Sequence, residues 1–186
     1  MCGRYYIDKD NEIIKSIVEK IRNKDGLKDS GEIFPGDEVP VISNNRNLEK
    51  DYFKMKWGYH IGKTTIINAK VETIYQKKMF VDGIERRRCV IPATNYYEWE
   101  HSRKDKYLIK QTDKDILYLA GVYRIEDGIP VFSIITRSSD SNISFIHERM
   151  PLIINEDDIE RWLNNKSDIK DILETENSNV EYKIVE

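Results

Sequence analysis

The chain has 186 residues, of which 39% are hydrophobic and 34% are charged, so it can bury the core of one domain and is not disordered throughout. It contains no apolar run of about 18 residues and no signal-peptide hydrophobic region, which argues against a membrane span and predicts a cytoplasmic protein. Two cysteines are too few for a disulfide framework or a zinc cluster, and a net charge of −3 argues against nonspecific nucleic-acid binding.

The first part of the chain predicts one strand, one helix and a long loop. A short strand is expected at residues 3–7. A helix is expected at residues 10–22, because aliphatic residues recur there at intervals of three and four. Residues 23–35 are rich in Gly, Asp and Lys and therefore predict a loop.

Short segments rich in β-branched and aromatic residues fill most of the remaining chain. They predict strands at residues 38–42, 52–58, 64–68, 88–92, 96–101, 107–111, 116–123, 131–136, 151–154 and 180–185. A helical turn is expected at residues 143–146 and a short helix at residues 167–173. Asn155 followed by Asp158 resembles an N-cap with an acid at N3, which predicts a helix through Leu163.

Many short strands with helices at the ends indicate an α+β fold, with a mostly antiparallel, barrel-like β-sheet core flanked by a few helices. No repeat or linker divides the sequence, so we expect residues 1–186 to form a single domain. The charge is uneven: residues 46–110 carry 15 Lys and Arg against 8 Asp and Glu, whereas residues 111–186 carry 8 against 16. The basic middle segment can attract polyanions, or it can be an ordinary solvated face.

Cys2 has the most informative position in the sequence. Removal of Met1 would leave an N-terminal cysteine, whose α-amine and thiol have reference pKa values of about 8 and about 8.5. Such a 1,2-aminothiol reacts with an aldehyde, because the amine forms a Schiff base and the thiol then closes a thiazolidine ring. It also suits acyl transfer by an N-terminal nucleophile. Position alone is explained more simply by a small buried hydrophobic residue.

Two further residues have the chemistry of an acid or a base. His147 is followed closely by Arg149, whose planar fork suits anions, although a lone histidine is more often structural. Glu98 stands among aromatic residues, where burial would raise its pKa toward the range used in acid–base catalysis. A solvent-facing carboxylate on an alternating strand explains the spacing of Glu98 equally well.

Three more residues have either a structural or a binding interpretation. Asn68 could orient a carbonyl or a hydroxyl, or it could form a turn. Trp57 and Trp99 are expected in the core by default. If their rings were exposed beside basic residues, they would stack on unpaired bases.

The motifs of the chain resemble one known family. They are MCGRY at residues 1–5, WG at 57–58, NAK at 68–70, ET at 72–73, RRCVIPA at 87–93, YEW at 97–99, GVY at 121–123, Thr136 and IHERMP at 146–151. In this order they span about residues 1–154 and resemble the SRAP (SOS response-associated peptidase) family, also described as abasic-site processing proteins. No single motif would suffice, but the whole set is specific.

The resemblance implies a covalent sensor of abasic sites in single-stranded DNA. Cys2, once Met1 is removed, would attack the ring-opened deoxyribose aldehyde and leave a thiazolidine DNA–protein crosslink, with slow self-reversal. It also implies an autopeptidase that exposes its own Cys2. The expected partner is single-stranded DNA that contains abasic sites, with the protein a monomer that is nucleoid-associated when bound to damaged DNA. No metal or cofactor is implied.

The resemblance also implies roles for particular residues. Glu98 would position or deprotonate the amine, His147 would act as general acid and base on the sugar hydroxyl, and Asn68 would hold the sugar or the Cys2 backbone. The implied DNA-binding residues comprise phosphate clamps, weaker contacts along a groove, two pocket tryptophans and a threonine. They are Arg4, Lys70 and Arg149; Lys78, Arg86 and Arg87; Trp57 and Trp99; and Thr136.

Three departures from the family pattern bear on these roles. Lys70 stands where an arginine is usual, so the charge is kept and the bidentate fork is lost. Asn95 replaces the usual glycine before YYEW, and the proline and second tryptophan expected after Trp57-Gly58 are missing. Two other functions stay open: a cysteine peptidase or amidohydrolase that uses Cys2 and His147 without a DNA role, and a noncatalytic module that binds single strands.

Overall fold

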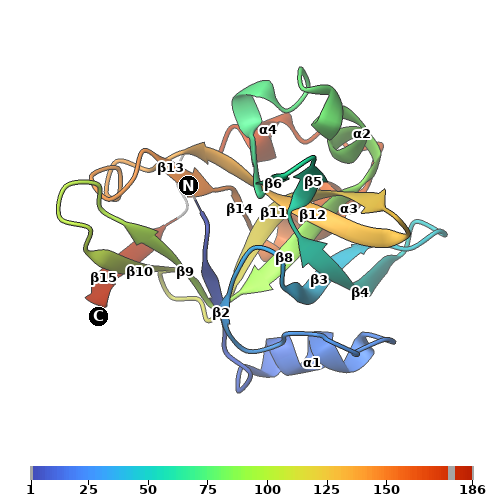
Figure 1. Cartoon of the computed structure of the whole chain (residues 1–186), viewed down its shortest axis with the longest axis horizontal. Coiled ribbons are helices and arrows are strands. Elements are labelled where there is room, and N and C mark those ends of the chain that lie inside the picture. The colour runs from blue at the N-terminus through green and yellow to red at the C-terminus, as the bar shows by residue number, and fades with distance from the viewer. Residues whose placement is uncertain (1, 176–178, 186) are drawn as a thin grey trace.

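A computed structural model describes residues 2–175 and 179–185 of the chain. Its centre is a closed ring of strands, shown in Figure 1. The ring runs in the order β12 (Ile129–Ser138), β4 (Lys50–Trp57), β3 (Glu38–Asn44), β8 (Arg88–Ala93) and β11 (Leu117–Glu126), and β11 pairs back to β12. All six residues of β8 are buried, because one face of this strand fills the ring and the other lies under helices.

Three short strands extend the ring. They are β13 (Arg149–Pro151) beside β12, β14 (Ile153–Ile154) beside β11, and β7 (Asn68–Lys70), which runs parallel to β12 with Ile134 opposite Asn68. The pairs β12–β4 and β12–β7 are parallel and the other pairs of the described strands are antiparallel. The predicted α+β class with a mostly antiparallel, barrel-like core is therefore confirmed.

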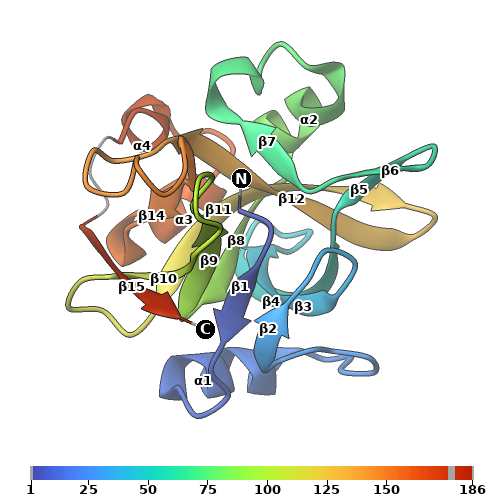
Figure 2. The same cartoon turned by 60° about the vertical axis from the view of Figure 1, so that its left-hand side comes forward.

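A second sheet stands against the ring and carries the N-terminal strand, as Figure 2 shows. Its order is β15 (Val180–Val185), β10 (Lys106–Gln111), β9 (Asn95–Trp99), β1 (Tyr5–Ile7) and β2 (Gly31–Ile33). Only Thr94 separates β9 from the ring strand β8, so this side sheet grows directly out of the barrel. A small hairpin of β5 (Tyr59–Ile61) and β6 (Thr64–Ile66) completes the strands.

Helices cover both ends of the molecule (Figure 1). Helix α1 (Glu12–Lys20) begins at Asn11, whose side chain accepts hydrogen bonds from the backbone N–H groups of Ile13 and Ile14. The other helical elements are η1 (Val71–Thr73), α2 (Lys78–Arg86), η2 (Glu156–Asp158), α3 (Ile159–Leu163) and α4 (Lys170–Leu173). Among the described residues, no helix is both long and apolar enough to cross a membrane.

The observed structure differs from the predicted one at strand β2, which lies within the loop predicted at residues 23–35, and at two helical regions. Helix α2 was not predicted, because Gly83 interrupts its middle and Lys77 provides no side-chain cap. A Cβ atom at Gly83 would lie 2.9 Å from Cβ of Val122, so the glycine lets α2 approach β11 closely. The capping interaction predicted for Asn155 and Asp158 is wrong: Asn155 makes no side-chain cap bond, and the 3-10 turn η2 precedes α3.

Arg88 fastens two helical regions to the barrel. The side chain is buried, and its guanidinium donates hydrogen bonds to the backbone carbonyls of Ile84, at 2.8 Å, and of Trp162 and Asn164. The indole Nε1 of Trp162 donates in turn to the carbonyl of Cys89 at 3.0 Å. The last turn of α2, the end of α3 and strand β8 are thus held at one point.

We expect Arg88→Met to lower the free energy of unfolding by about 3 kcal/mol, because three backbone carbonyls would lose a charged donor in a site closed to water. Urea unfolding followed by circular dichroism measures the change. Arg86→Met is the matched control, because Arg86 is exposed at the end of α2, the helix that Arg88 contacts. We expect it to change the free energy of unfolding by no more than about 0.5 kcal/mol. Equal losses of unfolding free energy in both variants would contradict this structural role of Arg88.

Candidate functional site

Cys2 lies fully buried where the side sheet meets the barrel. Its backbone carbonyl accepts a hydrogen bond from Nδ2 of Asn68 in β7, at 3.0 Å. Asn68 is itself fixed by the pairing of β7 with β12. Of the two contacts suggested for Asn68, the structure therefore contains the one to the Cys2 backbone.

Glu98 reaches the same place from strand β9. Tyr5 pairs with Tyr96, and the N–H of Tyr97 donates to the carbonyl of Arg4 at 2.9 Å. The antiparallel pairing therefore continues toward Cys2 on one segment and toward Glu98 on the other. Glu98 is only 4% exposed, and this burial raises the pKa of its carboxyl group. Burial, together with the charge of Glu98, raises the pKa of the Cys2 thiol well above its usual value.

His147 follows the turn that ends at Ile146, and its ring is held by the backbone. The N–H of Arg149 donates to Nδ1 of His147 at 2.9 Å, which leaves the proton of the neutral ring on Nε2. Burial lowers the pKa of His147. The ring of His101, in the turn between β9 and β10, lies over His147 with the two centroids 5.0 Å apart.

These groups form a site suited to reactions of an amine and a thiol. Cys2 provides the thiol, which its raised pKa keeps protonated near neutral pH. Glu98 is a buried carboxyl whose raised pKa suits proton transfer, and neutral His147 has an acceptor and a donor nitrogen. Among the described residues, no three His, Cys, Asp or Glu side chains gather as a metal site would require.

Arg149 has a different position from the one expected of a phosphate clamp. Its side chain is 8% exposed and makes a bidentate ion pair with Glu72, while Nη2 also donates to the carbonyl of Thr136 at 2.6 Å. Thr136 itself has no exposed surface. Arg149 therefore ties η1 to β12 and orients His147 through its backbone, and DNA contact by Arg149 or Thr136 stays a prediction.

Trp57 lies in the core, as expected of it by default. It is fully buried, its ring packs between Tyr5 at 5.2 Å and Phe132 at 6.3 Å, and Nε1 donates to the carbonyl of Ile67 at 3.1 Å. No part of the ring is available to a base. Trp57 supports the site indirectly, by packing against Tyr5 of β1, the strand that follows Cys2.

Trp99 and Arg4 meet on the outer face of the side sheet. The Arg4 guanidinium lies 5.0 Å from the Trp99 ring centroid and 4.2 Å from that of Phe34, and it pairs with Glu32 at 3.3 Å. Lys106 pairs with the same Glu32 carboxylate and lies 4.1 Å from the centroid of the Tyr97 ring. Two predicted DNA-binding residues are thus brought together in a half-exposed cluster of cations and aromatic rings.

The remaining basic residues lie beyond Asn68 along the chain. Lys70 is exposed at the end of β7, and Lys78 is exposed at the start of α2. Arg86 and Arg87 lie at the opposite end of α2, where both pair with Asp82, at 4.0 Å and 2.9 Å. Of these four residues, only Lys70 belongs to β7, the strand whose Asn68 contacts Cys2.

Two residues of the site were not predicted from the sequence. His101 was passed over because no motif marks it, yet it contacts His147. Glu72 belongs to a motif that was noted, but its ion pair with Arg149 depends on residues 77 positions apart. The available signal for His101 was its place three residues after Glu98, at the end of the strand predicted for residues 96–101.

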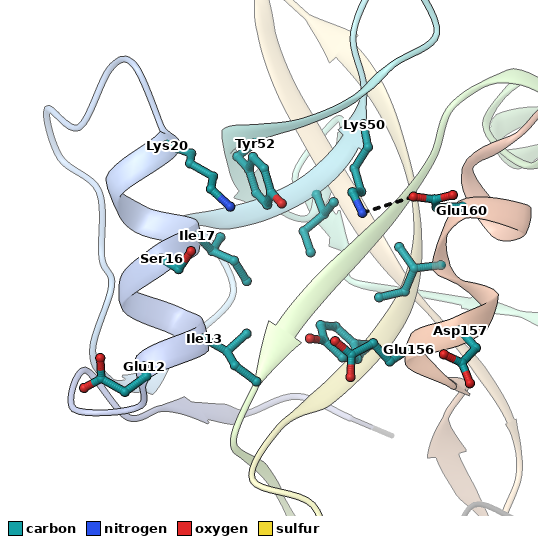
Figure 3. Close-up of a pocket in the computed structure, with 13 residues that line it drawn as sticks. Glu12, Ile13, Ser16, Ile17, Lys20, Lys50, Tyr52, Glu156, Asp157 and Glu160 are labelled. Atoms are coloured by element: carbon teal, nitrogen blue, oxygen red, sulfur yellow. Dashed lines mark hydrogen bonds and ion pairs between the residues drawn. The ribbon is translucent and has the colours of Figure 1, made fainter.

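A hollow of about 600 Å³ lies elsewhere, between α1 and α3 (Figure 3). Isoleucines and two tyrosines line its floor, Lys50 pairs with Glu160 across it at 3.4 Å, and Lys20 lies 4.8 Å from the Tyr52 ring centroid. None of the predicted catalytic or DNA-binding residues lines this hollow. It is separate from the cluster around Cys2.

Comparisons with known proteins agree on one family. The model of the SOS response associated peptidase (SRAP) family matches residues 1–186. The chain is 30% identical over 193 residues to abasic site processing protein YoaM of Bacillus subtilis, covering 94% of this chain and 84% of that protein. It is 26% identical over 178 residues to abasic site processing protein YedK of Escherichia coli, covering 88% and 79%. A crystal structure of a Bacteroides thetaiotaomicron protein superposes with a TM-score of 0.80 at 22% identity, covering 100% and 92%.

We expect His147 to titrate below its ordinary pKa of 6.5, and His101→Gln to raise the pKa of His147. Burial disfavours the charged imidazole, and the neighbouring His101 adds repulsion that the substitution removes. NMR titration of the imidazole Cε1–H signals measures both midpoints. His60→Gln, at an exposed histidine paired with Glu126, is the control. A His147 midpoint above 6.5, or equal shifts in both variants, would contradict the geometry.

Proposed function

The chain belongs to the SOS response associated peptidase family, and we propose that it captures abasic sites in single-stranded DNA by a covalent bond to Cys2. The observation that carries the proposal is that Asn68 and Glu98 both reach Cys2, while the ring of His147 lies against His101, whose charge acts on Glu98. The relatives named as abasic site processing proteins support DNA with abasic sites as the partner. Removal of Met1 is part of the proposal, because only a free α-amine at residue 2 can form an imine.

The reaction proceeds by condensation. The amine of Cys2 adds to the aldehyde carbon of the ring-opened sugar, and loss of one water gives the imine. The thiol sulfur then bonds to the same carbon while its proton passes to the imine nitrogen, which closes the thiazolidine. One water is released overall, and no oxidant or reductant is needed.

The protonation states set the order of these steps. The raised pKa of the Cys2 thiol keeps the sulfur protonated near neutral pH, so the amine attacks first. Glu98, whose own pKa is raised by burial, accepts the proton that the ammonium group loses. Neutral His147 presents Nε2–H to the sugar oxygen during ring opening and again when the imine is hydrolysed.

The DNA strand runs past this junction over two groups of side chains. Arg4 and Trp99 form one side, where a cation and a half-buried ring suit a phosphate and a base. Lys70 and Lys78 are exposed on the other side, and Arg86 and Arg87 extend the positive charge along α2. Phosphate contacts of this kind make binding weaken as salt rises.

We expect the mature protein to form a covalent band with a single-stranded oligonucleotide that carries one abasic site, and Cys2→Ala to abolish it. A denaturing gel shows the band, and mass spectrometry confirms that Met1 is absent and that the adduct mass equals protein plus DNA minus one water. Cys89→Ser is the matched control, because Cys89 is the other buried cysteine and lies in β8.

Three outcomes separate the possible functions. No band with verified abasic sites and free Cys2 would overturn the proposal. Binding without a covalent band would indicate a noncatalytic single-strand module. Turnover of amide substrates that depends on Cys2 and His147, with no DNA adduct, would indicate an amidohydrolase.

We expect His147→Ala to slow release of a preformed crosslink by about 100-fold, since removal of a positioned acid–base group typically costs that much. The rate is measured by trapping released abasic DNA in excess and following loss of the band with time. His60→Ala, at an exposed histidine that pairs with Glu126, is the control and should release DNA at the wild-type rate. Unchanged release in His147→Ala would remove this residue from the mechanism.

A further inference from the structure

An aromatic cluster stands at the edge of the side sheet, beside the site but outside it. Tyr107, Phe145 and Tyr182 contact one another in edge-to-face geometry, with ring centroids 5.3 to 5.8 Å apart. Tyr107 is 7% exposed and forms the base, whereas Phe145 is 51% exposed and Tyr182 44%. Ile184, 63% exposed, follows on the same strand β15. Such a group of apolar side chains in solvent indicates a binding surface.

The cluster is continuous with the catalytic groups through two elements. Tyr107 in β10 is paired directly with Glu98 in β9, so the two side chains leave the same face of the sheet. Phe145 stands two residues before His147 in the turn whose N–H groups at 146 and 147 donate to the carbonyl of Ile143. A molecule held at His147 would therefore meet this aromatic surface next.

Charge near the cluster favours an anionic chain. The turn between β9 and β10 carries Arg103 and Lys104 exposed at its tip, and the acidic residues that flank them, Glu100 and Asp105, are half-buried. Among the described residues, neither Arg103 nor Lys104 has an ion-pair partner within 4.0 Å. Exposed aromatic rings next to unpaired cations are the combination with which proteins bind single strands without regard to sequence.

We propose that Phe145 and Tyr182 form a stacking platform for a nucleobase that flanks the abasic residue, with Arg103 and Lys104 at the adjoining phosphate. The inference rests on the proposed function, since it places the neighbour of the nucleotide that Cys2 captures. The abasic residue has no base of its own, so a stack on its neighbour gives the strand a fixed position while the sugar reacts. Stacking is indifferent to which base is present, which suits damage that can arise anywhere.

The test uses a strand that binds without reacting. Full-length Cys2→Ala protein is mixed with an oligonucleotide carrying a tetrahydrofuran abasic analogue, flanked on the 5′ or the 3′ side by 2-aminopurine, whose fluorescence falls on stacking. We expect quenching from one of the two sides. Adding Phe145→Ala should abolish it and weaken binding about tenfold, the effect of losing one base–aromatic stack, whereas Phe145→Trp should retain both.

Ile129→Ala is the matched control, because Ile129 is 47% exposed on β12 and lies outside the cluster. Quenching and affinity that stay the same in Phe145→Ala, with the fold verified by circular dichroism, would overturn the platform. So would a concentration-dependent dimer that Phe145→Ala dissolves, which would assign the surface to a second copy of the chain. The proposed function is tested separately, by the crosslink of the wild-type protein. If the wild-type protein forms no crosslink, the quenching result can still be interpreted. If it forms the crosslink but no quenching is seen, the platform alone is rejected.

Discussion

The antiparallel pairing of β1 with β9 is the constraint on which the site depends. A residue at the start of a chain is ordinarily free to move, and a catalytic group there would lose its geometry. Here Tyr5 pairs with Tyr96, and the bond from Tyr97 N–H to the Arg4 carbonyl carries the pairing one residue further. Because β9 leaves the barrel through a single residue, the rigid ring of strands fixes the position of Cys2.

The barrel and the side sheet each contribute what the other lacks. The side sheet brings the Cys2 thiol and the buried carboxyl group of Glu98, and the barrel brings Asn68 on β7 and His147 beside β13. Burial raises the pKa of the Cys2 thiol and of the Glu98 carboxyl group, and it lowers the pKa of the His147 imidazole. All three groups are thereby shifted toward their neutral forms, so protons can move within the site with little change in net charge.

The sequence was sufficient for the fold class and for most strands, because β-branched and aromatic runs mark strands directly. It was insufficient wherever a tertiary contact overrides local preference: Gly83 is unfavourable within a helix yet lets α2 pack on β11, and β2 lies within what reads as a loop. The same limit applied to the site. Cys2 and Glu98 were candidates by position and by surroundings, and the resemblance to a known family was needed to favour a functional role over a structural one. The packing of Trp57 and the ion pair of Arg149 depend on segments distant in sequence. Residue type predicts the chemistry available, and only packing decides which atoms remain accessible.

The ion pair between Arg149 and Glu72 has a consequence for how this site can change in evolution. Glu72 touches none of the reacting groups, yet it holds the arginine whose own N–H holds the imidazole of His147. Replacing Glu72 leaves the buried Arg149 guanidinium without its carboxylate partner, whereas replacing Arg149 leaves a Glu72 side chain that is 48% exposed to solvent. Because the two side chains share one ion pair, the two substitutions together should cost less than the sum of each alone. Such coupling means that the energetic effect of a substitution at position 72 depends on the residue at position 149, although 77 positions separate the two in the sequence.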